Sequence, residues 1–250
     1  MAKQVHAAFA ACSASKFELM RGPFVRQRRS DEQETEKAIF LVVRKIRDGI
    51  LDETFKPGER LPEEQLGKMF NVSRSPVREV LLALEKEGTV VMEPYKGAIL
   101  KPLSSEEVLD IAELRLAVIT LAAKAAYRHL SPADFDFAYG LAKQITRSNS
   151  AKEHFERNRR FWDIIFEGTR RPIRWEVFRQ LDDRMARYFP LFHKLFPDPA
   201  TRPRQQEVLI EFCRVGKVDE AVRAFKKNYL EVVHQMIDHL ETGESANSSR

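Results

Sequence analysis

The sequence has few cysteines and no long apolar run, and both absences restrict the class of protein. Among its 250 residues the only cysteines are Cys12 and Cys213, which are too few and too far apart in the sequence for a disulfide framework. The most apolar stretch, "LRLAVITLAAKAAY" at 114–127, is interrupted by Arg115 and Lys124, so it does not predict a membrane span. We therefore expect a reduced, cytoplasmic protein that has no membrane partner.

Sequence motifs of common enzymes are also missing. There is no G-x-S-x-G nucleophile motif, no phosphate-binding P-loop and no Cys/His pair. Cys213 shares an apolar helical stripe with Leu209 and Phe212, which is typical of a core residue. Asp182 and Asp183 are adjacent, so a helix would point them apart, and they make a poor acid/base pair. The sequence predicts a protein that is not an enzyme.

The composition is that of a globular protein with a basic N-terminal segment. Apolar residues make up 43% and charged residues 32%, enough for one large domain or two small ones. The net charge of +5 permits binding to a polyanion without requiring it. Most of the excess lies in residues 1–30, with six Lys or Arg against one acid. We expect this segment to be a flexible tail that is either merely solvated or in contact with nucleic acid.

Residues 31–103 have the pattern of a winged helix-turn-helix domain. Apolar residues at helical spacing predict helices over 36–51, over 63–70, and from about Ser73 to Gly88. The second and third are joined by a short turn, which makes a helix-turn-helix unit. Residues 89–102, "TVVMEPYKGAILKP", contain two β-prone runs around a Pro94–Gly97 turn and predict a hairpin.

The third of these helices begins with an unusual polar set. Pro76 is tolerated there because amides in the first turn have no intrahelical acceptor, and Ser73 or Ser75 can cap the exposed donors. Away from the core face lie Ser73, Arg74, Ser75 and Arg78. Hydroxyl and guanidinium groups at the positive end of a helix favour anions, above all phosphates.

From Ser104 onward the pattern changes to long helices with almost no strand signal. Ser104 or Ser105 caps the first helix, and Ser131 precedes Pro132 at the start of the second. The predicted helical segments are 104–130, 131–145, 151–168, 172–192, 202–215 and 217–241. About six helices in residues 104–241 predict an all-α bundle, so the whole fold is mainly α. Residues 242–250 are polar and are expected to be disordered.

Several of these segments resemble a known family. The order of "LPEEQL" (61–66), "VSRSPVRE" (72–79) and a glycine-containing hairpin resembles the DNA-binding half of the GntR family of bacterial transcription regulators. "LRLAV" (114–118) and "RVGKVDEAVRAF" (214–225) resemble the ligand-sensing bundle of its FCD subgroup, to which the fatty-acid-responsive regulators are related. The resemblance covers about residues 35–240. It implies a regulator whose bundle controls its grip on double-stranded operator DNA.

The resemblance also implies which residues contact DNA. Arg74 and Arg78 would be the main base readers, Ser73 and Ser75 would hold the backbone, and the wing tip of Tyr95, Lys96 and Gly97 would meet the minor groove or a phosphate. The alternative is that both arginines are ordinary solvated residues. Because one helix-turn-helix buries little surface, we expect a homodimer that binds a palindrome-like site, acting as a repressor.

The metal site of many FCD bundles is altered in this sequence. In those bundles an Asp, a His four residues later and two further histidines hold a metal, which in turn holds a carboxylate effector. The alignment places Asn158, Trp162, Gln206 and Asn228 at these four positions. Neutral amides bind divalent transition ions poorly and Trp does not bind them, and the six histidines form no i, i+4 pair. We expect no metal and no cofactor.

Without a metal, the effector must be bound by side chains. Arg115 corresponds to an arginine that points toward the cavity in the family, and its planar fork suits a carboxylate or phosphate. With Asn158, Trp162, Gln206 and Asn228 it would bind a small anionic effector, a carboxylate or acyl compound, in a partly apolar pocket. Two alternatives remain. In the first, Trp162 simply fills the space that the metal occupies in other family members, and the bundle is only a dimerisation scaffold. In the second, the protein binds DNA constitutively without an effector.

Overall fold

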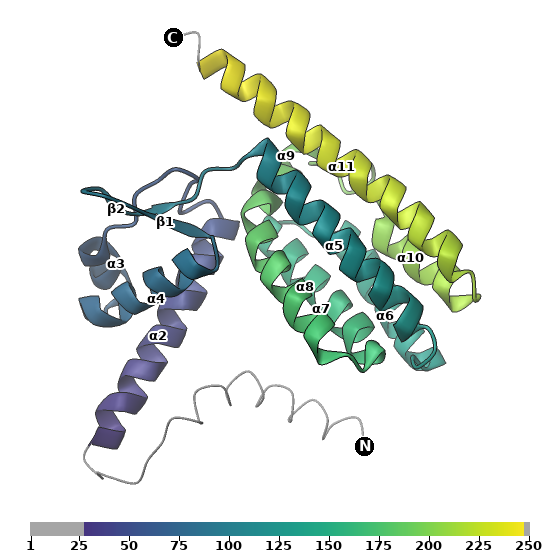
Figure 1. Ribbon diagram of the computed structural model, residues 1–250, viewed down its shortest axis with the longest axis horizontal. Helices are drawn as coiled ribbons and strands as arrows, with labels where there is room; N and C mark the ends of the chain where they lie inside the picture. The colour runs from purple at the N-terminus through teal and green to yellow at the C-terminus, as the bar shows by residue number, and fades with distance from the viewer. Residues whose placement is uncertain (1–27, 248–250) are drawn as a thin grey trace. The chain divides into compact units, whose positions relative to one another are not determined.

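The computed structural model describes residues 28–247, with side chains described for residues 36–242 (Figure 1). The chain divides into two units between Ala38 and Ile39. The second unit contains α2 from Ile39 onward, the rest of the winged helix and the helical bundle. Of the basic segment 1–30 that we expected to be a tail, residues 1–27 lie outside the described part, and helix α2 begins at Arg28.

The winged helix-turn-helix predicted from the sequence is confirmed. It consists of α2 (Arg28–Leu51), α3 (Glu63–Phe70), α4 (Arg74–Lys86), β1 (Val90–Glu93) and β2 (Gly97–Leu100). The strands pair antiparallel, with Val90 opposite Leu100 and Glu93 opposite Gly97. Arg60 forms a single bridge with Ile99, which fastens the loop after α2 to the hairpin. These pairings hold the wing beside the helix-turn-helix unit.

The apolar stripes noted in the sequence form the core of this domain. The buried side chains from α2, α4 and the hairpin include Val42, Ile46, Ile50, Val77, Val80, Leu81, Leu84, Val90 and Leu100. Each such side chain contributes about 1.5–3 kcal/mol by leaving water. The turn between α3 and α4 passes through Asn71 in the left-handed conformation, with φ of 55°. Gly88, with φ of 75°, follows the last residues of α4.

The bundle is built from α5 (Ser105–Ala126), α6 (Pro132–Thr146), α7 (Ala151–Thr169), α8 (Pro172–Met185), α9 (Phe189–Leu195), α10 (Gln205–Arg214) and α11 (Val218–Asn247), with the 3₁₀ helix η2 (Ala186–Tyr188) before α9. Helix α5 packs against α7, α8 and α11 and is the central helix (Figure 1). Ser104 caps α5 by accepting from the Glu107 amide, and Ser131 forms a complete capping box with Asp134 on α6.

Helix α2 begins at Arg28, eight residues before the predicted start at 36, and two segments of the bundle also differ clearly from the sequence prediction. The segment 172–192, predicted as one helix, is divided by η2, because Pro190 has no amide hydrogen to continue the backbone ladder and instead lies in the first turn of α9. Helix α11 continues to Asn247, into the segment 242–250 for which disorder was expected, since extending an existing helix costs little. None of the described helices has the length and apolar character that crossing a membrane requires.

Candidate functional site

The first site is the N-terminal end of α4. Ser73, Arg74, Ser75 and Arg78 are all exposed, whereas Pro76 and Val77 are buried, so this turn presents its polar face to solvent. Ser73 occupies the N-cap position with an extended backbone, but its hydroxyl makes no capping hydrogen bond. The helix end therefore keeps amide donors and a hydroxyl that an anion can use.

Both arginines at this end face acidic side chains of α3. The Arg74 guanidinium donates to Glu64 at 2.5 Å, and the Arg78 guanidinium lies 4.0 Å from Glu63. The pKa of Glu64 is lowered, first by a hydrogen bond from Lys68 and then by the charge of Arg74. The arginine side chains remain 66% and 70% exposed, so these pairs are weak and a DNA phosphate or guanine edge can compete for them.

The second part of this surface is the wing tip. Tyr95 is fully exposed and has a positive φ of 64°, a conformation that is unfavourable for a bulky residue. Gly97 also has a positive φ, of 78°, at no such cost. The Lys96 ammonium contacts Glu93 at 2.6 Å on the surface. The tight turn therefore displays an aromatic ring and an ammonium group with little of the hairpin covering them.

The second site is a small cavity inside the bundle, with a volume of about 50 Å³. Four of the five effector residues predicted from the sequence line it, namely Arg115, Asn158, Trp162 and Gln206. The fifth, Asn228, is half-buried and does not line the cavity. Its neighbour Tyr229 does, because one residue along a helix turns the side chain by about 100°.

Three of the four residues at the family's metal positions, Asn158, Trp162 and Gln206, are joined by hydrogen bonds. The Asn158 amide oxygen accepts from Trp162 Nε1 at 3.2 Å and from Gln206 Nε2 at 2.8 Å. Trp162 is fully buried, with its ring against Phe161, Phe178 and Phe225. The described side chains include no group of three or more His, Cys, Asp or Glu placed to hold a metal ion. This donor set does not fit a transition metal.

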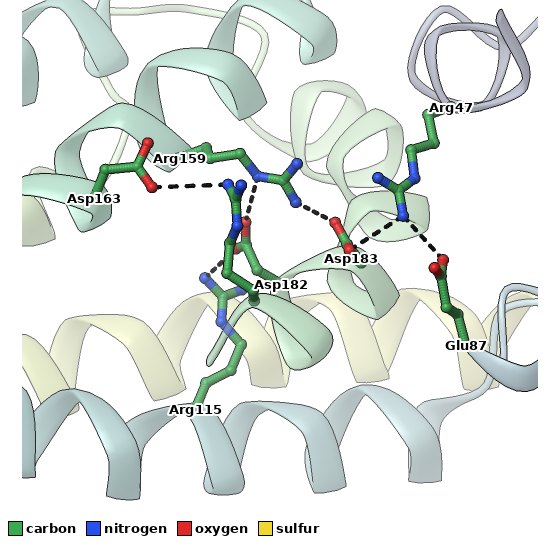
Figure 2. Close-up of polar contacts among 8 residues, drawn as sticks. Arg47, Glu87, Arg115, Arg159, Asp163, Asp182 and Asp183 are labelled. Carbon is green, nitrogen blue, oxygen red and sulfur yellow. Dashed lines mark hydrogen bonds and ion pairs between the residues drawn. The ribbon is translucent and has the colours of Figure 1, made fainter. Parts of the chain in front are cut away.

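Arg115 is not an isolated cation. Its guanidinium donates to Asp182 at 2.9 Å, and Asp182 is completely buried (Figure 2). The guanidinium also lies over the Phe178 ring, 5.1 Å from its centre. The charge expected to bind an anionic effector is thus already balanced by a carboxylate from α8, which sequence reasoning did not identify.

Four buried polar atoms of the cavity-lining residues have no hydrogen-bond partner among the described residues: Arg115 Nε, His154 Nδ1, Gln205 Oε1 and the Tyr229 hydroxyl. The Tyr229 hydroxyl lies near the Arg115 guanidinium without a bond of normal geometry, and burial raises its pKa while the Arg115 charge partly opposes that rise. Burial is the main reason that the pKa of His154 lies well below its usual value, and the nearby His193, Arg202 and Arg157 lower it further. Unpaired buried polar atoms are rare in folded proteins.

Sequence reasoning missed three of these residues, His154, Gln205 and Tyr229. For His154 a signal was present, since it precedes Asn158 and Trp162 by four and eight residues and so shares their face of α7. Together these side chains offer donors and acceptors without a net charge of their own. The cavity is therefore suited to a small polar group.

The sequence matches two family descriptions over most of its length. Residues 41–100 match "Bacterial regulatory proteins, gntR family", and residues 110–243 match the FCD domain. The chain belongs to the gntR family. The winged helix and the bundle correspond to its two parts, as the motifs in the sequence predicted, and the family is one of transcription regulators rather than enzymes.

Two related proteins agree with this assignment. The uncharacterized HTH-type transcriptional regulator YdhC of Bacillus subtilis (strain 168) is 31% identical over 172 residues, and the match covers 66% of this chain and 65% of that protein. The HTH-type transcriptional repressor RspR of Escherichia coli (strain K12) is 25% identical, covering 64% of this chain and 73% of RspR.

The structures of E. coli McbR/YncC and of a putative transcriptional regulator GntR from Rhodococcus sp. RHA1 share the fold. Their TM-scores are 0.68 and 0.65 at 19% and 18% identity, covering 81% and 82% of this chain and 98% of each of those chains.

Proposed function

We propose that this gntR-family chain is a sequence-specific DNA-binding repressor of transcription. The supporting observation is the exposed N-terminal turn of α4, where Arg74 and Arg78 face solvent on a helix anchored by a buried apolar stripe. Such an end enters the major groove in helix-turn-helix proteins, where an arginine can bond a guanine edge. Ser73 and Ser75 would bond the backbone, and the wing tip of Tyr95, Lys96 and Gly97 would contact the minor groove or a phosphate.

The active form in this proposal is a homodimer. Helices α5 and α8 pack on each other, and each leaves apolar side chains exposed. These are Leu114 and Leu121 on α5, and Ile173 and Val177 on α8. A self-complementary face of this kind suits a two-fold dimer, which would present two α4 helices to a palindrome-like operator. Light scattering should report a dimer for the natural chain and a monomer for Leu121→Asp.

The bundle is proposed to bind a small anionic metabolite without a metal. Support comes from the unpartnered Arg115 Nε and Tyr229 hydroxyl, two donors at one cavity that an acceptor oxygen can satisfy. The volume of about 50 Å³ is well below the roughly 300–1,000 Å³ of drug-sized ligand pockets. The cavity as it stands therefore fits a carboxylate head group, and an acyl or aromatic part requires the lining to open.

A specific observation favours a second function for the bundle, that of a dimerisation scaffold alone. Trp162 fills much of the space between α7 and its neighbours, and Asn158 and Gln206 already bond each other. Calorimetry with fatty acids, acyl-CoAs, sugar acids and aromatic acids separates the two functions. On the sensor proposal one class binds the natural chain, Arg115→Ala no longer binds that class, and Trp162→Ala changes which ligands fit.

The DNA-binding proposal is tested by selecting bound sequences from a random pool of double-stranded DNA. A palindrome-like consensus is the expected result, and candidate metabolites are then tested for release of the selected DNA. Recovery of unenriched DNA would contradict sequence-specific binding. Absence of any binder in the calorimetric screen would leave the scaffold function in its place.

A further inference from the structure

A continuous row of alternating charges leads from the cavity to helices α2 and α4 of the winged helix (Figure 2). Arg115 at the cavity bonds Asp182 at 2.9 Å, and the other oxygen of Asp182 lies 3.5 Å from Arg159 Nε. Arg159 also bonds Asp183. Arg47 on α2 then contacts Asp183 at 3.2 Å and Glu87 at 2.9 Å. We call these six side chains the charge row.

The members of the charge row come from five places in the fold. Arg115 lies on α5, Arg159 on α7, Asp182 and Asp183 on α8, Arg47 on α2, and Glu87 is the C-cap of α4. The two aspartates are adjacent in the sequence, so α8 points them in different directions. Asp182 faces Arg115 and Asp183 faces Arg47, as Figure 2 shows. The pair that makes a poor catalytic dyad is well placed to bridge two regions.

Exposure rises along the charge row away from the cavity. The side chain of Asp182 is 0% exposed, those of Arg159 and Asp183 are each 20% exposed, and that of Glu87 is 40% exposed. Charges interact more strongly where water is excluded, so a change at the buried end alters the balance at the next pair. Arg159 is the shared member, because it pairs with both aspartates.

We propose that the charge row transmits the occupancy of the cavity to the C-terminal end of α4, an inference that rests on the proposed sensor function. An acceptor oxygen that bonds Arg115 Nε and the Tyr229 hydroxyl draws the guanidinium away from Asp182. Asp182 then interacts more strongly with Arg159, and Arg159 interacts less with Asp183. Asp183 is then free to interact with Arg47. Arg47 in turn moves from Glu87 toward Asp183, and α4 loses its ion pair to α2. The ligand group this requires is a carboxylate or similar oxygen acceptor.

The test uses hydrogen–deuterium exchange of the full chain and needs neither DNA nor a ligand. Arg115→Gln stands in for a ligand that removes Arg115 from Asp182. Exchange of amides near Arg47 on α2 and near Glu87 should become roughly 2- to 30-fold faster, the range expected for residues coupled along a network. In an Asp183→Asn background, Arg115→Gln should add no further change at these amides, because the row is already broken.

A matched control is available outside the charge row. Lys194 on α9 pairs with Glu53 at 2.6 Å, another ion pair between the bundle and the segment after α2. In a Lys194→Gln background, the effect of Arg115→Gln should persist in full. If Arg115→Gln impairs folding, Arg115→Lys weakens the pair with Asp182 because it loses the forked geometry, and a smaller change of the same kind is expected at the same amides.

Additive effects of Arg115→Gln and Asp183→Asn, or unchanged exchange near Arg47 and Glu87, would overturn the proposal. Equal loss of the effect in the Lys194→Gln background would also overturn it, because the signal would then be general loosening. Since neither DNA nor effector is present, a negative result here is distinct from failure of DNA selection or of the ligand screen.

Discussion

The exposed end of α4 and the buried cavity place similar polar chemistry in opposite surroundings. At α4, Arg74 meets Glu64 in water, and the side chains come from one short stretch. In the bundle, Arg115 meets Asp182 away from water, and the two residues are 67 positions apart in the sequence. An arginine–carboxylate pair at the first place is weak and can be exchanged for another anion, whereas at the second it is part of the structure. Position in the fold, more than residue type, decides the role.

The largest expected difference between the two regions is in stability. Asp182→Asn leaves the buried Arg115 without its carboxylate partner and should lower the free energy of unfolding by about 3–5 kcal/mol. Glu64→Gln breaks an exposed pair and should leave the free energy of unfolding nearly unchanged. Urea denaturation of both variants measures the two costs. Similar losses of unfolding free energy in the two variants would show that burial does not distinguish the two regions.

The next largest effect concerns pH. The lowered pKa of the buried His154 means that the unfolded chain takes up a proton below about pH 6.5 while the folded chain does not. Its contribution to stability is therefore complete above that pH and is lost as the pH falls, by at most about 1.4 kcal/mol per pH unit. His154→Leu should flatten the decline in unfolding free energy between pH 7 and pH 5.

Two other groups also contribute to the pH dependence of the unfolding free energy. Burial lowers the pKa of His193 to about 4, so a decline of the same sign remains in the variant. Burial raises the pKa of Asp163 to about 6, so the contribution of Asp163 to stability falls as the pH rises toward that value. Asp163 is present in both the natural chain and the His154→Leu variant, so its effect is common to both. His234→Leu, at an exposed position on α11, is the matched control. An unchanged slope in His154→Leu would contradict the burial argument.

A smaller effect is expected at the DNA-binding surface. Glu64→Gln removes the acidic partner that DNA must displace from Arg74, so affinity for the selected DNA should increase by up to about fivefold. Competition binding at constant salt measures this ratio, because phosphate contacts depend strongly on ionic strength. Weaker binding by the variant would mean that Glu64 positions Arg74 for its contact instead of competing with DNA.

No effect is expected from removing metal ions. Because Asn158 Oδ1 is already occupied by two donors, a chelator should leave the unfolding temperature unchanged. Elemental analysis of the purified chain should show no stoichiometric zinc, nickel or manganese. About one metal ion per chain would indicate that the cavity rearranges to form a site that the present side-chain positions do not contain.

The winged helix was predictable because its signals are local. Apolar spacing, the proline in the first turn of α4 and the hairpin turn all lie within a few residues of the structure they specify. Their order along the chain also carries the family resemblance. The break at η2 was less visible, since a proline inside an apolar stripe can either begin or end a helix.

The cavity was only partly predictable because it is assembled from separate helices. The family pattern identified four lining residues, namely Arg115, Asn158, Trp162 and Gln206. On α11 the prediction was off by one residue, because Tyr229 lines the cavity and the predicted Asn228 does not. Asp182 could not be assigned, since nothing near it in the sequence indicates that α8 delivers it to Arg115. Such long-range pairs depend on how helices pack, which local periodicity does not specify.

The central claim, that the N-terminal turn of α4 reads DNA, is tested most directly by the affinity of Arg78→Ala for the selected operator. Arg74→Ala and Arg78→Ala should each weaken binding by about 1–3 kcal/mol, roughly 5- to 150-fold, whereas Arg147→Ala, at an exposed arginine of the bundle, should not. Operator affinity equal to that of the natural chain in both α4 variants would contradict the account.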